Sequence, residues 1–193
     1  MKNSKTLVLV EGAAMIALAT VLSLIKVYKL PWGGSITLLS MVPICIFSIK
    51  RGIGYGMAVS FLYSLVQLFM DLGEILGWGL TAGTLIACFA LDYILAYSSL
   101  GIAGIFRKLG TGGWIAGVVL ALLARLAMHF LSGVLIWHSV GKVWNFDTSN
   151  EYLYSLLYNG SYMVPEIVFT TIAVVFLFKL PQTKKLLSAS ENQ

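Results

Sequence analysis

The sequence contains little charge. Asp, Glu, Lys and Arg together make up 11% of the 193 residues, whereas hydrophobic residues make up 59%. Soluble domains usually carry roughly 25% charged residues. So small a share cannot cover a water-facing surface, and we therefore expect an integral membrane protein.

Histidine and cysteine are also scarce, with two residues of each. His129 and His138 alone provide too few ligands for a common type of zinc site. Cys45 and Cys88 lie in apolar runs without C-x-x-C spacing, which is typical of small buried hydrophobic residues. We expect neither a metal site nor a disulfide.

Motifs for nucleotide binding and hydrolysis are absent. The chain has no G-x-x-x-x-G-K-[ST], no H-E-x-x-H and no G-x-S-x-G. A P-loop ATPase and the corresponding hydrolases are therefore excluded. The basic residues lie beside apolar stretches, so membrane topology explains them and we expect no nucleic-acid partner.

Long apolar stretches are the main feature that the sequence does contain. A helix needs about 20 apolar residues to cross a bilayer. The second stretch is short and contains Pro43, and we expect it to be tilted or broken. The sequence predicts an all-α protein, with one domain over residues 1–193 and six transmembrane helices, roughly at 6–27, 36–50, 53–71, 79–105, 112–138 and 162–180.

Basic residues alternate along the connections between these stretches. Nine of the thirteen Lys and Arg residues fall on one predicted side. Because Lys and Arg are enriched in cytoplasmic loops, both termini are predicted to be cytoplasmic. The nine residues are Lys2, Lys5, Lys50, Arg51, Arg107, Lys108, Lys179, Lys184 and Lys185.

Ionisable residues inside the predicted spans are candidates for function, because charge in a bilayer is costly. Asp92 lies in the fourth span, and Arg125 and His129 lie four residues apart in the fifth. At 1.5 Å per residue, Asp92 and Arg125 are both about 20 Å below the outer surface. They can form an ion pair, or Asp92 can face an outward-open cavity and neutralise a cationic ligand.

Aromatic residues favour the second alternative. Trp137 lies eight residues after His129, nearly on the same helical face, and the two rings predict a column that can hold a flat heteroaromatic ring. The outer segments 28–35 and 138–161 are rich in Trp and Tyr, which is typical of either an interfacial belt or a binding site. Glu11 and Glu166 lie near predicted span ends, where structural roles are expected.

Small residues line one face of the first span. Ala13 and Ala17 form a small-xxx-small pattern, which lets helices approach closely in lipid. The pattern favours either packing within the protein or docking of a partner protein.

Six segments taken together resemble the substrate-binding S component of energy-coupling factor vitamin transporters, specifically its thiamine-specific branch. The resemblance covers nearly the whole chain. The segments are VEGAAMIALATVLS, PWGGSITL, KRG, LDYILAYSSLGIAG, RLAMHFLSGVLIW and YNGSYMVPE.

The resemblance implies a multi-pass protein of the bacterial cell membrane that captures thiamine from outside. It further implies a transmembrane coupling subunit and two ATPase subunits as partners, docking through Ala13 and Ala17, and no cofactor. Tyr63 stands where the family is expected to have Trp. The implied ligand-binding residues are Trp32, Tyr63, Asp92, Tyr93, His129, Trp137, Tyr154 and Asn159.

Other functions remain open at this point. One is an S component for another vitamin or for a thiamine precursor. A second is an intramembrane hydrolase that uses Asp92 or His129. A third is a proton-coupled carrier with Asp92, Arg125 and Glu166 as its relay.

Overall fold

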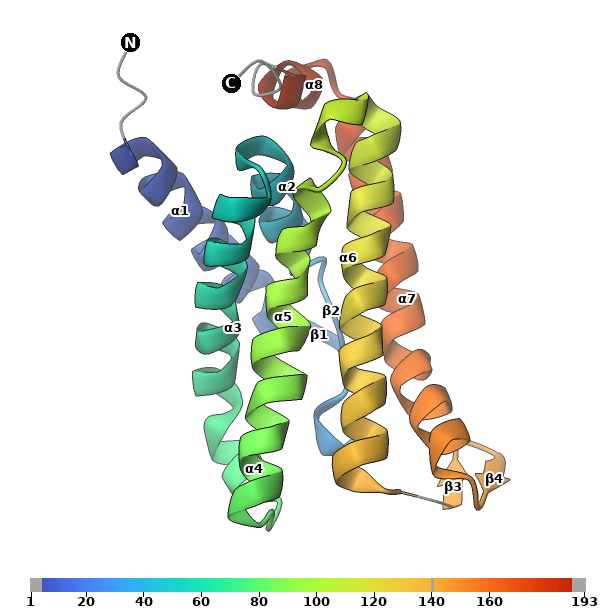
Figure 1. Ribbon diagram of the computed structural model, residues 1–193. Helices are drawn as coiled ribbons and strands as arrows, with labels where there is room; N and C mark the ends of the chain where they lie inside the picture. The colour runs from blue at the N-terminus through green and yellow to red at the C-terminus, as the bar shows by residue number, and fades with distance from the viewer. Residues whose placement is uncertain (1–4, 140, 189–193) are drawn as a thin grey trace.

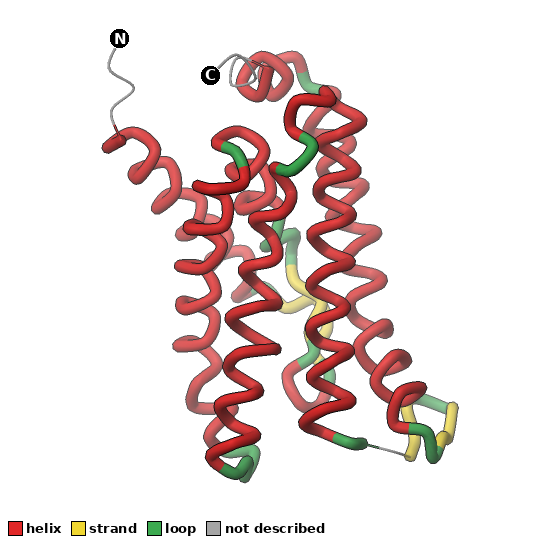
Figure 2. Tube along the Cα trace, viewed as in Figure 1, coloured by secondary structure: helices red, strands yellow, loops and turns green. Residues whose placement is uncertain are grey.

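The computed structural model describes residues 5–139 and 141–188, and most of them are helical (Figures 1 and 2). The prediction of an all-α protein is confirmed, with two small antiparallel hairpins added: β1 (Lys26–Lys29) with β2 (Ser35–Thr37), and β3 (Gly141–Val143) with β4 (Phe146–Thr148). The helices are α1 (Lys5–Leu24), α2 (Val42–Arg51), α3 (Ile53–Leu76), α4 (Ala82–Cys88), α5 (Ala96–Ser98), α6 (Gly110–Ser132), α7 (Glu151–Lys179) and α8 (Pro181–Ser188).

Several helical stretches depart from regular α-helical winding. A π-helical stretch, Phe89–Leu95, joins α4 to α5, and a 3-10 stretch, Ser99–Gly104, follows α5. We refer to the continuous helical segment 82–104 as the α4–α5 rod. A second π-helical stretch, Gly133–Trp137, continues α6. Such π segments are rare and occur frequently at functional sites.

Within the described residues, four helical stretches are long and apolar enough to cross a membrane: Lys5–Leu24, Ile53–Leu76, Ala82–Trp137 and Glu151–Lys179. The third has 56 residues and reverses direction between α5 and α6, so it forms two antiparallel arms (Figure 1).

The predicted second span, 36–50, is not one helix. It begins as β2, turns through Leu39 at a φ of 58°, and continues as α2. Pro43 lies in the first turn of α2, where its missing N–H is tolerated. With 10 residues, α2 is about 15 Å long, roughly half of the hydrocarbon thickness.

Two helix ends differ from the predicted span ends. The first span ends at Leu24 because the β1–β2 hairpin begins at Lys26. The last helix begins at Glu151 rather than at residue 162, because the Asn150 side chain caps it by accepting from the backbone N–H groups of Tyr152 and Leu153. Glu166 therefore lies in the middle of α7, not near its start.

The basic connections gather at one end of the bundle. The start of α1, the α2–α3 turn, the α5–α6 turn and α8 lie together there (Figure 1). These segments and the end of α7 carry the residues predicted to be cytoplasmic, except that Lys2 lies outside the described residues.

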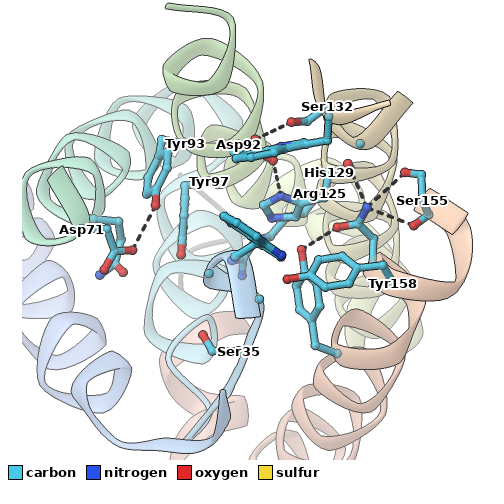
Figure 3. Close-up of a pocket in the computed structure, with 18 of the residues that line it drawn as sticks. Ser35, Asp71, Asp92, Tyr93, Tyr97, Arg125, His129, Ser132, Ser155 and Tyr158 are labelled. Atoms are coloured by element: carbon cyan, nitrogen blue, oxygen red, sulfur yellow. Dashed lines mark hydrogen bonds and ion pairs between the residues drawn. The ribbon is translucent and has the colours of Figure 1, made fainter. Parts of the chain in front are cut away.

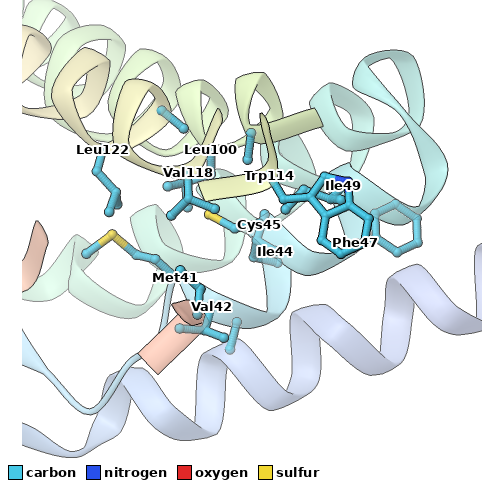
Figure 4. Packing of buried hydrophobic residues seen from close by; sticks show 14 of the residues in the cluster. Met41, Val42, Ile44, Cys45, Phe47, Ile49, Leu100, Trp114, Val118 and Leu122 are labelled. Atoms are coloured by element: carbon cyan, nitrogen blue, oxygen red, sulfur yellow. The ribbon is translucent and has the colours of Figure 1, made fainter. Parts of the chain in front are cut away.

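The largest hydrophobic core cluster lies around α2 (Figure 4), which is toward this basic end (Figure 1). Glycines let the neighbouring helices approach closely: a Cβ on Gly101 would lie 2.6 Å from the Met57 backbone. Tight packing here leaves the opposite half of the bundle for a cavity. The labelled core side chains are Met41, Val42, Ile44, Cys45, Phe47, Ile49, Leu100, Trp114, Val118 and Leu122.

Candidate functional site

A cavity of about 230 Å³ lies in the half of the bundle away from the basic end, and Figure 3 shows side chains that line it. Side chains from α3, the π stretch Phe89–Leu95, α6 and α7 form its walls, and the β1–β2 hairpin contributes residues 26, 32–35 and 37. We refer to residues 26–37 as the cover hairpin. The cavity thus combines distant parts of the chain.

Asp92 is a carboxylate that lines this cavity. Its Oδ1 lies 2.9 Å from Nδ1 of His129, and its Oδ2 accepts a hydrogen bond from the Ser132 hydroxyl. The Asp92 side chain is 18% exposed and lines the cavity. Two groups on α6 therefore fix the carboxylate so that it faces the hollow.

Arg125 is not the partner of Asp92. Its guanidinium carbon lies 4.1 Å from the centre of the Tyr97 ring, and one of its terminal nitrogens lies 2.8 Å from the sulfur of Met41. In the described part of the chain, Asp92 is held by its hydrogen bonds with His129 and Ser132. The predicted alternative of an Asp92–Arg125 pair is therefore wrong, because equal depth in the membrane does not place the two side chains on facing sides.

Aromatic rings form much of the cavity wall. Trp137 lies 6.2 Å from Trp32 and 5.4 Å from Trp78 between ring centres, whereas the His129 ring lies 5.9 Å from Tyr162. Both side chains line the cavity, and each contacts different rings. The predicted column of His129 and Trp137 stays a prediction.

Asn159 connects α7 to α6. Its Nδ2 donates to the backbone oxygens of His129 (3.1 Å) and Ser155 (3.0 Å), and its Oδ1 accepts from the Tyr162 hydroxyl (2.9 Å). The side chain is buried but belongs to the cavity lining. It therefore fixes the helix pair that carries His129.

The three tyrosines at the start of α7 differ in whether they line the cavity. Tyr154 and Tyr158 line the cavity and stack at 6.4 Å, with an interplanar angle of 8°. Tyr152 is 58% exposed and is not part of the lining. Of the three, Tyr154 and Tyr158 are placed to contact a ligand.

The cover hairpin is tied to α3 by two ion pairs. Lys26 lies 3.8 Å from Asp71, and Lys29 lies 2.7 Å from Glu74. Between these strands, Trp32 adopts a left-handed conformation with a φ of 65°, which is uncommon for a non-glycine residue and points to a functional constraint. This conformation places the Trp32 ring at the cavity.

Most of the predicted ligand-binding residues come together at this cavity. Tyr63 does not: it is fully buried behind Tyr97, with a ring distance of 5.5 Å. Ser132, three residues after His129, was missed although the spacing signals a shared helical face. The predicted residues that line the cavity are Trp32, Asp92, Tyr93, His129, Trp137, Tyr154 and Asn159.

The small residues of α1 have two orientations. Gly12 is buried, and a Cβ there would lie 2.8 Å from a methyl carbon of Val59 on α3. Ala13 and Ala17 are exposed and face away from the bundle. Packing within the chain therefore involves Gly12 and leaves the alanines open.

Membrane-spanning helices around a cavity with a buried carboxylate and aromatic walls define a membrane protein that binds a small molecule. The family described as "Thiamine transporter protein (Thia_YuaJ)" matches residues 9–186. This chain belongs to that family.

Individual relatives agree with this assignment. The thiamine transporter ThiT of Bacillus subtilis is 33% identical, over 92% of this chain and 94% of the relative. ThiT of Lacticaseibacillus paracasei is 25% identical, over 94% and 92%. The solved structure of ThiT from Listeria monocytogenes superposes with a TM-score of 0.72 at 25% identity, covering 96% of this chain and 99% of that one. The prediction of a multi-pass bacterial membrane protein is confirmed.

Proposed function

We propose that this chain captures thiamine from the outer side of the membrane, as the substrate-binding S component of an ATP-driven energy-coupling factor transporter. The observation that carries the proposal is the carboxylate of Asp92, which opens into an aromatic cavity instead of pairing with Arg125. Thiamine is a permanent cation with two flat rings. Membership of this chain in the thiamine transporter family further supports the proposal.

Each part of the ligand has a matching group in the cavity. Asp92 neutralises the thiazolium charge, and Trp32 and Trp137 provide faces for the rings. Asn159 meets the edge of the aminopyrimidine, because its amide can both donate and accept. To do so, it exchanges its hydrogen bond with Tyr162 for one with the ligand.

The proposed transport step relies on partner subunits. The sequence has no P-loop, so ATP hydrolysis would be supplied by two ATPase subunits that act through a transmembrane coupling subunit. Ala13 and Ala17 face outward on α1, where small side chains allow close approach of another helix. In this role the chain is a binding protein without enzymatic activity, and thiamine is its substrate rather than a cofactor.

Calorimetric titration of the purified chain tests the choice of ligand. Thiamine, riboflavin, biotin and the aminopyrimidine precursor are titrated separately, and thiamine is expected to bind most tightly. Tight binding of another vitamin, with thiamine no better than millimolar, would overturn the assignment.

Uptake by reconstituted vesicles tests the coupling. Vesicles that contain the chain with coupling and ATPase subunits are expected to accumulate thiamine only with ATP. Accumulation by the chain alone, driven by a pH gradient, would instead support a proton-coupled carrier.

A further inference from the structure

Glu166 is a buried acid that the binding site does not use directly. It lies in α7, is only 1% exposed, and is not part of the cavity lining. Its Oε1 accepts two hydrogen bonds from Thr37, one from the backbone N–H at 2.5 Å and one from the hydroxyl at 2.7 Å. Its Oε2 has no hydrogen-bond partner in the described part of the chain.

Both of these donors belong to the cover hairpin. Thr37 is the last residue of β2 and lines the cavity, and its hydroxyl also lies 2.7 Å from the hydroxyl of Ser40. A buried acid without donors is costly in an apolar environment. Because Thr37 supplies both donors, lifting β2 away from α7 would leave Glu166 without a hydrogen bond.

The other strand of the hairpin is held on the opposite side of the cavity. Lys26 pairs with Thr37 in the strand register and with Asp71 on α3. The two strands therefore connect α3 to α7, and the segment between them brings Trp32 to the cavity. Its polar attachments to α7 include the Thr37–Glu166 contact and the hydrogen bond from the Tyr158 hydroxyl to the oxygen of Pro31. Leu30 also belongs to one apolar cluster with Tyr162 and Met163 of α7.

We propose that Glu166 is a positioning residue that locks β2 of the cover hairpin onto α7 and thereby slows escape of the bound ligand. This proposal rests on the proposed function, because the ligand in question is thiamine. Glu166 acts through Thr37 and not by contact with the ligand. Its removal therefore affects how long the ligand stays more than how the ligand is oriented.

Dissociation kinetics provide the first test. Thiamine is displaced from the purified protein in a stopped-flow instrument, and tryptophan fluorescence follows its release. Glu166→Ala is expected to raise the dissociation rate constant by about tenfold to a hundredfold, because two buried hydrogen bonds are lost. Glu166→Gln keeps an acceptor without the charge and is expected to give a smaller increase.

Two further variants make the test specific. Thr37→Val removes the hydroxyl but keeps the backbone N–H, and its effect is expected to be largely absent when Glu166 is already alanine, as for two residues that act through one contact. Thr170→Val is the matched control, since Thr170 is equally buried one turn further along α7 and does not line the cavity. It is expected to leave dissociation unchanged.

A second readout needs no ligand. Lys29 is exposed, and trypsin cleavage after it reports how often the cover hairpin opens. Glu166→Ala is expected to speed this cleavage, whereas Thr170→Val is not. Faster cleavage without any thiamine binding by the wild-type chain would overturn the proposed function and leave the lock intact as a structural contact.

Unchanged dissociation and unchanged cleavage in a folded Glu166→Ala protein would overturn the lock itself. The same holds if Thr170→Val matches Glu166→Ala in both measurements, because the effect would then be general to α7.

Discussion

Replacing Asp92 by asparagine removes one negative charge from the cavity and little else. The amide oxygen can still accept from Nδ1–H of His129, and the Ser132 hydroxyl can turn to accept from the new NH₂ group. We therefore expect Asp92→Asn to fold normally and to lose affinity for a cationic ligand.

Coulomb's law gives the size of this loss. A thiazolium ring stacked beside the carboxylate places the two charges about 5 Å apart, and an effective dielectric constant of about 20 gives roughly 3 kcal/mol. This corresponds to about two orders of magnitude in Kd. Calorimetric titration of wild-type and Asp92→Asn protein with thiamine measures it.

A neutral ligand separates charge from shape. In the thiophene isostere of thiamine, carbon replaces the charged ring nitrogen, so the ligand is neutral. We expect Asp92→Asn to change the affinity of the protein for this isostere by less than about threefold. Asp71→Asn serves as the protein control, because Asp71 also lines the cavity but has Lys26 as its partner. An equal loss for both ligands would refute the electrostatic reasoning.

Three further variants test other parts of the site. Trp137→Ala is expected to weaken thiamine binding by about tenfold or more, since base-like rings gain about 1–3 kcal/mol from an aromatic face; a titration showing full affinity would contradict this. Gly133→Ala is expected to lower the melting temperature in detergent, because the added methyl group meets the Ser155 side chain on α7; unchanged melting would show that α6 and α7 can separate freely. Ala13→Leu with Ala17→Leu is expected to leave thiamine affinity intact and to reduce ATP-driven uptake in reconstituted vesicles, and normal uptake would remove α1 as the docking face.

Hydropathy predicted the helical architecture because the apolar stretches are long and largely uninterrupted. The stretches at 53–71, 79–105 and 112–138 correspond to α3, to the α4–α5 rod and to α6 with its π extension. The start of α7 was missed because residues 151–161 are polar and aromatic rather than aliphatic. The sequence does contain a local signal for the start of α7, because Asn150 is a favourable N-cap residue.

The candidate site was predicted by residue type and not by geometry. A carboxylate among aromatic residues in apolar segments predicted the cavity lining, because charge inside a bilayer is costly and therefore marks functional sites. The partner of Asp92 could not be predicted, because helical spacing assumes regular winding and Asp92 lies on a π-helical stretch. The burial of Tyr63 and the anchoring of Thr37 by Glu166 depend on tertiary packing that no local pattern encodes.

A structure of the purified protein with thiamine bound tests the central claim most directly. The thiazolium ring is expected beside the carboxylate of Asp92, with Trp137 at a ring face and the cover hairpin closed above it. Thiamine bound outside this cavity, or bound within it with the thiazolium far from Asp92, would contradict the account.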